Sequence, residues 1–361
     1  MKRNTIFEKI TQHFEQNLPF ASFHKPNSKK LIGVFQNDTR LFQIKDFNEK
    51  GFAFVSFDGA NRILLPLDKS QVLIQDIETN TNQKSLLNQD DSEVENSKLD
   101  YTALVQKAVD AIHNGAFEKV VLSRKETLSL PQFNLNIIFK KLLQAYPSAF
   151  TYCFFHPKVG LWLGAFSEQL IRIKNRNLHT MAVAGTQWHQ ENEPVVWGIK
   201  EKAEQQFVTD FIVNSLIDHV SDPKVSEPYT MKAGTLLHIK TDIEAVLNKP
   251  SNLREVLDIL HPTPAVCGFP KLPAKDFILQ NEGYDREFYA GFLGEFNHDF
   301  EKNDNTTELY VNLRCMKIQQ DDDRKTAVNL YVGGGITKDS IPENEWTETV
   351  NKTKTIKQIL Y

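Results

Sequence analysis

Residues Ser340–Tyr361 read SIPENEWTETVNKTKTIKQILY, and the rest of the chain can be interpreted outward from this stretch. Ser340 followed by Glu343 is a capping-box pattern, and Pro342 is tolerated in a first turn, so we expect a helix to begin here. At about 100° per residue, the core-facing stripe of this helix comprises Glu345, Glu348, Lys352, Thr355, Ile356 and Ile359, whereas Lys354, Lys357 and Gln358 point away. Ions on such a stripe cost roughly several kcal/mol each unless they are paired or bound to a metal.

A second predicted helix, Ile199–Val220, has the same construction. Glu201 and Glu204 extend its apolar stripe, which comprises Phe207, Val208, Phe211 and Ile212, whereas Lys202, Gln206 and Asp210 lie elsewhere on the helix. Four carboxylates from two facing helices would repel one another unless a divalent cation held them, and oxygen-only ligands favour Mg²⁺. The alternative is that both E-x-x-E pairs lie on solvated helix surfaces, where such pairs are common.

Composition excludes several classes of partner. The chain has 361 residues, 40% of them hydrophobic, and its formal net charge of −4 gives no global attraction to nucleic acid or to an anionic membrane. No apolar run approaches the ~20 residues of a membrane span, and Met1–Gln16 lacks the apolar core of a signal peptide. We therefore expect a cytoplasmic protein, monomeric or weakly dimeric. Cys153, Cys267 and Cys315 are too widely spaced to indicate a metal knuckle or a disulfide framework.

Apolar patterning divides the chain into two parts. Residues 1–97 contain predicted strands at 29–37, 39–44, 51–58 and 61–67 and a polar, acidic linker at 75–97, and we expect this part to belong to the same compact fold as the remainder. In residues 98–361, helices are predicted at 101–112, 134–145, 199–220, 252–260 and from 340, and an irregular loop at 261–273. Strands are predicted at 119–127, in a meander over 149–186, and at 235–241, 288–297, 307–319 and 327–335. This order indicates an α+β fold of layered antiparallel sheets with helices outside.

Three charged side chains stand beside apolar runs, where burial would tune their chemistry. Lys119 opens the strand KVVLSR and could be a general base if its stem is buried, or a strand-end lysine in water. Glu168 follows LWLGAF; a partly dry site would raise its pKa, as suits a general acid, but a lone glutamate could equally lie on the surface. Arg314, inside the predicted strand YVNLRCMKI, needs a buried anion, either a ligand carboxylate or an internal salt-bridge partner.

Glycines and a loop histidine supply further candidate contacts. Gly333–Gly335 end a strand, let a ligand approach the backbone closely and leave amides free to bind an anion. Gly185 and Thr186, at the end of MAVAGT, offer a similar anion contact or simply a turn. His261 in HPTP could position a substrate oxygen or be a satisfied loop histidine. No phosphate-binding glycine motif of the usual nucleotide-binding types is present.

Taken in order, a series of segments resembles the chorismate-utilising enzymes, the family of isochorismate synthase, salicylate synthase, anthranilate synthase component I and aminodeoxychorismate synthase. The segments are FEKVVLSR (117–124), LGAFSEQL (163–170), AVAGT (182–186), IKEKAEQ (199–205), HPTPAVCGFP (261–270), FYAGFLGEF (288–296), LYVNLRC (309–315), YVGGGI (331–336) and SIPENEWTETVNK (340–352). They cover about Leu99 to the C-terminus. The resemblance implies two stacked antiparallel sheets flanked by helices, with a Mg²⁺-dependent site for chorismate between them.

Residue by residue, the resemblance also implies roles. Glu204 and Glu348 would bind the metal ion, and Glu201 and Glu345 would act on it through water. The enolpyruvyl carboxylate of chorismate would be held by Arg314, Tyr289 and the amides of Gly333 and Gly335, while Lys352 would assist near the metal. Further expected substrate contacts are Gly185, Thr186, His261, Ala265 and Gly268.

Two positions in the family differ with the reaction. Members that add an amine read Q-x-N-L-A-Q where this chain reads KVVLSR, and aminodeoxychorismate synthases read P-I-K-G-T where this chain has Val183-Ala184-Gly185-Thr186. Lys119 together with Ala184 therefore favours water as the nucleophile. Lys119 would deprotonate water for attack at ring C2, and Glu168 would protonate the departing C4 hydroxyl.

The implied activity is that of an isochorismate synthase, an isomerase that converts chorismate into isochorismate for menaquinone or catechol siderophore biosynthesis. Two departures from the family pattern bear on the site: the frequent G-A-S-P-E-L lacks its proline at Ser167, and Gln205 replaces a frequent histidine beside the metal ligand. Alternatives are a salicylate synthase, which also eliminates pyruvate and tends to have threonine at the Ala265 position, an amine-adding chorismate enzyme, or a non-catalytic binding scaffold.

Overall fold

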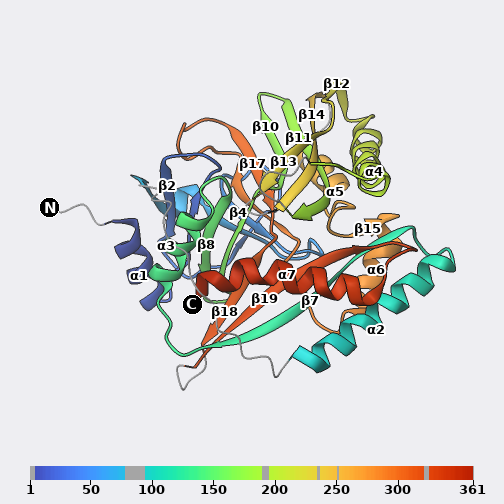
Figure 1. Ribbon diagram of the computed structural model, residues 1–361. Coiled ribbons are helices and arrows are strands. Elements are labelled where there is room, and N and C mark those ends of the chain that lie inside the picture. The colour runs from blue at the N-terminus through green and yellow to red at the C-terminus, as the bar shows by residue number, and fades with distance from the viewer. Residues whose placement is uncertain are drawn as a thin grey trace.

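Two stacked antiparallel β-sheets form the centre of the protein (Figure 1). The computed structural model describes residues 5–77, 94–188, 195–233, 236–249, 252–320 and 325–360. In spatial order, the first sheet comprises β15 (Gly268–Phe269), β7 (Lys119–Leu130), β19 (Thr326–Ile336), β18 (Cys315–Gln320), β9 (Gly160–Phe166), β8 (Phe150–His156), β1 (Phe20–His24), β2 (Lys30–Gln36) and β6 (Ser70–Asp76). The second comprises β12 (Val220–Val225), β14 (Leu236–Leu247), β11 (Asn177–Trp188), β10 (Gln169–Lys174), β17 (Thr306–Val311), β16 (Phe292–Phe296), β4 (Gly51–Val55), β5 (Arg62–Pro66) and β3 (Phe42–Gln43), and β13 (Tyr229–Ala233) pairs with β14.

Helices cover these sheets and line their junction. α1 (Ile6–Glu15) and α3 (Leu135–Ala145) share one apolar cluster with the first sheet. α2 (Val94–His113) and α7 (Pro342–Leu360) lie side by side, and α7 runs along β19 (Figure 1). α4 (Ile199–Leu216) packs on β11 and β14, and α5 (Leu253–Leu260) packs on α4, while α6 (Lys271–Asn281) packs on β7 and β15. Within the described residues, no helix has the length and apolar character that crossing a bilayer requires.

Aromatic side chains fill the space between the sheets. Phe54 of β4 stacks on Phe288 with ring centroids 4.2 Å apart and contacts Phe154 of β8 at 4.6 Å, so it joins the two layers. Trp162 of β9 is fully buried beside the same group. Because alternate residues of a strand face the same side, these rings all point into the core and fix the stacking of the sheets. The predicted α+β fold of stacked antiparallel sheets with flanking helices is confirmed.

The chain crosses from one sheet to the other at two places where the sequence predicted continuous pairing. β9 belongs to the first sheet and β10 to the second, so the meander predicted over 149–186 is wrong at its centre, next to Glu168. The predicted strand 307–319 is two strands, β17 and β18, in different sheets, with Arg314 in the left-handed region at φ 44° between them. The crossings are adjacent, because the N–H of Val311 donates to the carbonyl of Glu168 at 2.9 Å.

Several elements differ from those predicted. The N-terminal strands appear as β2 to β5 and lie in both sheets, but α1, β1 and β6 were not predicted, although Thr5 and Glu8 form a readable capping box at the start of α1. α4 ends at Leu216 rather than at the predicted Val220, where β12 begins, and α6 begins inside the predicted loop 261–273. α2 begins at Val94, inside the predicted linker, of which residues 78–93 lie outside the described part of the chain.

α7 differs from its prediction in two details. It begins at Pro342, and the Ser340 hydroxyl, rather than forming the predicted capping box, accepts a backbone N–H and donates to Glu345 at 2.7 Å. Lys357, predicted to point away, contacts Glu126 of β7. α7 is therefore held on more than one face, and its buried residues include Trp346, Thr349 and Thr353 as well as Glu345, Ile356 and Ile359.

Candidate functional site

A cavity of about 280 Å³ lies at the junction of the two sheets and the helices α4 and α7. Its volume is close to the lower end of the range for small-molecule sites, roughly 300–1,000 Å³. It brings together thirteen residues singled out from the sequence: Lys119, Glu168, Gly185, Glu201, Glu204, Ala265, Tyr289, Arg314, Gly333, Gly335, Glu345, Glu348 and Lys352. These residues come from segments far apart in the chain, and the two sheet crossings place Glu168 and Arg314 in the same lining.

Lys119 is the first residue of β7 and reaches into the cavity from a buried stem. Its side chain is 8% exposed, and its Nζ donates to Glu204 Oε1 of α4 at 2.6 Å. A Cβ on Gly335 of β19 would lie 3.0 Å from Lys119 Cε, so a larger residue there would displace the lysine side chain from its present position. The amine is thus positioned between β19 and Glu204 of α4.

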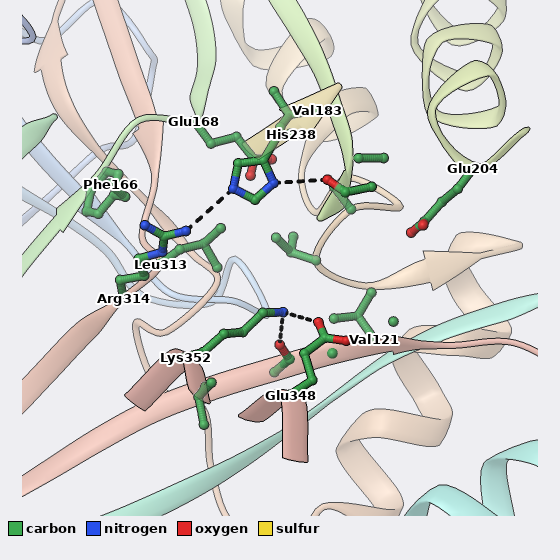
Figure 2. Close-up of a pocket in the computed structure, with 18 of the residues that line it drawn as sticks. Val121, Phe166, Glu168, Val183, Glu204, His238, Leu313, Arg314, Glu348 and Lys352 are labelled. Carbon is green, nitrogen blue, oxygen red and sulfur yellow. Dashed lines mark hydrogen bonds and ion pairs between the residues drawn. The ribbon is translucent and has the colours of Figure 1, made fainter. Parts of the chain in front are cut away.

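Glu168 and Arg314 lie at the two adjacent sheet crossings, and both side chains line the cavity (Figure 2). Burial raises the pKa of Glu168 to about 7, against the opposing influence of the nearby Lys119 and Arg314. The guanidinium of Arg314 lies 3.5 Å from Nε2 of His238, whose Nδ1 is 3.0 Å from the carbonyl of Gly185. That carbonyl needs a donor, so Nδ1 carries the proton and Nε2 presents its lone pair to Arg314. Burial and Arg314 lower the pKa of His238 to about 4, so this histidine is neutral near pH 7.

The wall of the cavity opposite α4 is formed by α7 (Figure 2). Lys352 donates to Glu348 Oε1 at 2.6 Å and to the carbonyl of Gly333 at 2.9 Å, which ties the helix to the glycine-rich end of β19. Glu345 is buried and accepts from the Ser340 hydroxyl. Glu204 and Glu348 therefore approach the cavity from different sides, each bound to one lysine.

The structure places two predicted substrate contacts, His261 and Gly268, outside the cavity lining and does not test a third, Thr186. His261 is not in the lining. Its Nε2 lies 3.1 Å from the carbonyl of Phe57, and burial lowers its pKa to about 3. Of the two predicted roles, the structure therefore favours a loop histidine that bonds within the protein. Gly268 of β15 pairs with Val120 of β7 and is not in the lining. A Cβ on it would meet the Lys119 carbonyl at 2.2 Å, so this glycine allows close packing of β15 on β7. The side chain of Thr186 lies outside the described part of the structure.

His238 is the main lining residue that the sequence analysis missed. It lies in LLHIK, an ordinary apolar alternation that predicts a strand and nothing more. A register shift in the β11–β14 pair falls between Ala184 and Thr186, directly opposite. Such bulges re-aim side chains and backbone groups, which explains how the Gly185 carbonyl meets His238. No local signal in the sequence indicates this pairing.

The lining has the ligand chemistry of a hard divalent cation. Among the described residues that line the cavity, five are glutamates and three are lysine or arginine, so acidic groups are in excess. Carboxylate oxygens are the donors that Mg²⁺ prefers in proteins. The four glutamates of α4 and α7 nevertheless do not converge on a single point, because Glu204 and Glu348 are bound to Lys119 and Lys352.

A different acidic group does converge. Within the described residues, the only group of three or more potential ligand residues with atoms within 4.8 Å of one another comprises Glu295, Asp299 and Glu308. Lys25 Nζ lies among them, 2.9 Å from Glu295 and 3.1 Å from Asp299. The buried lysine already compensates these carboxylates, and the group lies outside the cavity. We therefore assign it to the internal ion pairs of the fold.

Comparison with known proteins places this cavity in a family. A family model described as chorismate binding enzyme matches residues 58–361. The isochorismate synthase EntC of Escherichia coli (strain K12) is 27% identical over 266 residues, which cover 71% of this chain and 66% of EntC. The isochorismate synthase MenF of the same strain is 29% identical over 272 residues, covering 73% of this chain and 60% of MenF. The matched region thus spans less than two thirds of either relative.

Solved structures show the same fold. The structure of MenF from Escherichia coli has a TM-score of 0.78 at 22% identity and covers 95% of this chain and 89% of that one. Anthranilate synthase component I from Streptococcus pneumoniae TIGR4 has a TM-score of 0.65 at 17% identity, covering 93% and 89%. The family model spans most of the chain and includes every residue of the cavity lining. The chain belongs to the family of chorismate binding enzymes.

Proposed function

We propose that this protein is an isochorismate synthase, which adds water at C2 of chorismate and removes the C4 hydroxyl. One observation carries the proposal: a buried lysine and a glutamate with a pKa raised to about 7 line the same cavity. A base and an acid are what a reaction that deprotonates water and protonates a leaving hydroxyl requires. The relatives named above are isochorismate synthases, which supports the same reaction.

Chorismate is a dianion, and the cavity offers cationic and amide donors for it. Arg314, Tyr289 and the amides of Gly333 and Gly335 are assigned to the enolpyruvyl carboxylate. A planar guanidinium suits a carboxylate, and the pKa of Tyr289 is raised by burial, so its hydroxyl remains a donor. The neutral imidazole of His238 contacts the Arg314 guanidinium through Nε2 and adds no charge to the cavity.

The ring carboxylate is assigned to a divalent cation, Mg²⁺, at the acidic end of the cavity. Glu204 and Glu348 would hold it directly, and Glu201 and Glu345 through water. The cation would supply charge neutralisation for the ring carboxylate and would compete with Lys119 for Glu204. Lys352, bound to Glu348, would keep that glutamate turned toward the cavity in either case.

The proton transfers then fall to Lys119 and Glu168. The Lys119 amine takes a proton from water as the water oxygen forms a bond to ring C2, and both ring double bonds shift: C1=C2 becomes C1=C6, and C5=C6 becomes C4=C5. The C4–O bond breaks, and Glu168 donates its proton to the departing hydroxyl, which leaves as water. One water enters and one leaves, so the product is an isomer of the substrate. Each group is expected to contribute roughly 10²–10⁴-fold to the rate.

Water rather than an amine is the proposed nucleophile because Ala184, which lines the cavity, has no nucleophilic group. Gln205, which stands where a histidine is frequent, is buried and donates to Thr209 at 2.9 Å and to Thr241. The contact with Thr241 ties α4 to β14, so Gln205 serves the packing of the helix that carries Glu204.

Product analysis tests the proposal. The protein is incubated with chorismate and Mg²⁺, and the products are separated by liquid chromatography against standards. Isochorismate in equilibrium with chorismate is the expected result. Salicylate together with pyruvate would assign the salicylate synthase reaction instead, and no turnover at saturating Mg²⁺ would indicate a binding scaffold. A Lys119→Ala preparation serves as the matched control for contaminating activity.

A further inference from the structure

The edge of β7 next to Lys119 is only partly covered by another strand. On one side β7 pairs with β19 along its length. On the other side β15 pairs only with Lys119 and Val120, and the N–H of Val121 donates to the carbonyl of Cys267 at 2.8 Å. Beyond this point, within the described residues, no strand lies opposite the carbonyl of Val121 and the N–H of Ser123. Both residues are buried, so these backbone groups need other partners.

A buried ion pair supplies these partners. Glu282 directly follows α6, and its Oε1 accepts from the N–H of Ser123 at 2.7 Å. Arg286 Nη2 donates to the carbonyl of Val121 at 2.6 Å. The two side chains also bond to each other, from Nε to Oε2 at 2.7 Å and from Nη2 to Oε1 at 2.5 Å, and they are 2% and 1% exposed. The carboxylate and the guanidinium thus take the place of the C=O and N–H groups of a neighbouring strand.

Arg286 also contacts two other parts of the cavity lining. Its Nη1 donates to the carbonyl of Val266, in the loop before β15, at 3.0 Å, and its own backbone carbonyl accepts from the N–H of Tyr289 at 2.8 Å. Val121, Val266 and Tyr289 all line the cavity, whereas Arg286 lies behind them and does not. One residue therefore connects β7, the loop before β15 and the tyrosine that is assigned to the substrate.

Stability alone does not explain an ion pair at this place. Removing two charges from water is costly, and an apolar pair of similar volume often gives a protein that is as stable or more stable. An apolar pair would, however, leave the Val121 carbonyl and the Ser123 N–H without partners. The guanidinium holds its donors in fixed directions, and its plane is set by the ring of Phe57, whose centroid is 4.4 Å away. The pair therefore fixes the geometry of the groups that it contacts.

We propose that Arg286 and Glu282 are positioning residues of the reaction, whose contacts with the β7 edge determine where Lys119 stands in the cavity. The inference rests on the proposed function, because it takes Lys119 as the base. Lys119 is two residues from Val121 on the same strand, so a shift of this edge moves the amine. Misplacing a reacting group by about 1 Å, even through a substitution far from the chemistry, can lower a rate roughly 10²-fold.

A buried ion pair outside the cavity provides a matched control. Lys25 Nζ lies 2.9 Å from Glu295 of β16, and these side chains are 11% and 0% exposed, so the pair is similarly buried. It belongs to the other sheet and does not line the cavity. Glu282→Gln and Glu295→Gln are therefore the same chemical change in two buried ion pairs. A purely structural role for Glu282 predicts that both changes lower stability and that neither alters the activity of the folded protein.

The experiment measures chorismate consumption with Mg²⁺ by steady-state kinetics, and urea unfolding by circular dichroism, for the full chain and three variants. In Glu282→Gln and Arg286→Lys we expect kcat to fall about tenfold or more with a smaller rise in KM, because the base is displaced. A lysine ammonium cannot reproduce the planar fork that contacts both carbonyls and both carboxylate oxygens. In Glu295→Gln we expect a lower urea midpoint with kcat unchanged.

The outcomes separate the inference from the proposed function. Wild-type kcat in folded Glu282→Gln and Arg286→Lys overturns the positioning role and leaves the proposed function intact. An equal fall of kcat in Glu295→Gln also overturns it, because the effect would then follow from breaking any buried ion pair. No chorismate consumption by the wild type overturns the proposed function and the inference with it. If Arg286→Lys fails to fold, Glu282→Gln, which keeps the shape of the side chain, decides the question.

Discussion

Replacing Glu168 by glutamine should inactivate the protein and stabilise it at the same time. Glutamine keeps the size of the side chain and removes the acidic proton. As the assigned general acid, Glu168 must be protonated to act, and its pKa is about 7. We expect kcat of Glu168→Gln to fall roughly 10²–10⁴-fold while KM for chorismate changes little, because the contact is made chiefly in the transition state.

The stability gain follows from the raised pKa. A carboxyl group with a pKa near 4.5 in the unfolded chain and about 7 in the folded protein destabilises the folded state by up to roughly 3 kcal/mol once it is ionised. The cavity admits water, so we expect about 1–3 kcal/mol. The sign is fixed: wild-type stability is lost as pH rises from about 4.5 through 7. Glu168→Gln should be the more stable protein at pH 8 and should lose that advantage below about pH 4.5.

Two assays check this pair of effects. Urea unfolding of both proteins at pH 4.5 and pH 8 gives the difference in stability, and the pH profile of wild-type kcat/KM should decline above about pH 7 as Glu168 loses its proton. Lys125→Gln, a change outside the cavity lining, is the control for removal of a charge. A fully active Glu168→Gln variant, or one that is less stable than wild type at pH 8, would refute the argument.

Other variants test neighbouring parts of the account. Lys119→Ala should abolish turnover while calorimetric chorismate binding remains; near-normal kcat would show that another group is the base. His238→Ala removes the group beside Arg314 and should raise KM for chorismate about tenfold with a smaller change in kcat, measured by steady-state kinetics, and an unchanged KM would argue against a supporting role. Gly268→Ala would bring a methyl group within 2.2 Å of the Lys119 carbonyl at a backbone φ of 135°, and should cost about 1–3 kcal/mol in urea unfolding; an unaltered midpoint would contradict the packing argument.

The sequence predicts most strands but not the sheet to which each belongs. Around Glu168 the run LWLGAFSEQLIRI is apolar on both sides, so local pattern predicts one meander, whereas tertiary packing sends its halves to different sheets. The same holds for YVNLRCMKI around Arg314. Alternation of side chains is a property of a strand, and it carries no information about which partner the strand meets. The sequence indicates Glu168 and Arg314 as candidates because each is a charged residue beside an apolar run. It does not indicate that both lie at the sheet crossings.

Site residues were predictable where an ion stood on an apolar stripe or beside an apolar strand, where glycines ended a strand, or where the family resemblance implied them. Glu204 and Glu348 were recognised because carboxylates in a helix's buried face need compensation. His238 offered no such signal, since a histidine in an apolar strand is an ordinary core residue. The ion pair between Lys119 and Glu204 was likewise not predicted, because contacts between distant segments depend on the folded arrangement, whereas Lys352 and Glu348 are four residues apart on one helix.

The most direct test of the account is the position of a divalent ion in the protein. Crystals grown with Mn²⁺, which replaces Mg²⁺ at oxygen ligands, would locate the ion by its anomalous scattering. We predict a peak in direct contact with Glu204 and Glu348, inside the cavity that contains Lys119 and Glu168. A peak at Glu295, Asp299 and Glu308 instead, with none between α4 and α7, would contradict the assignment of this cavity as the metal and chorismate site.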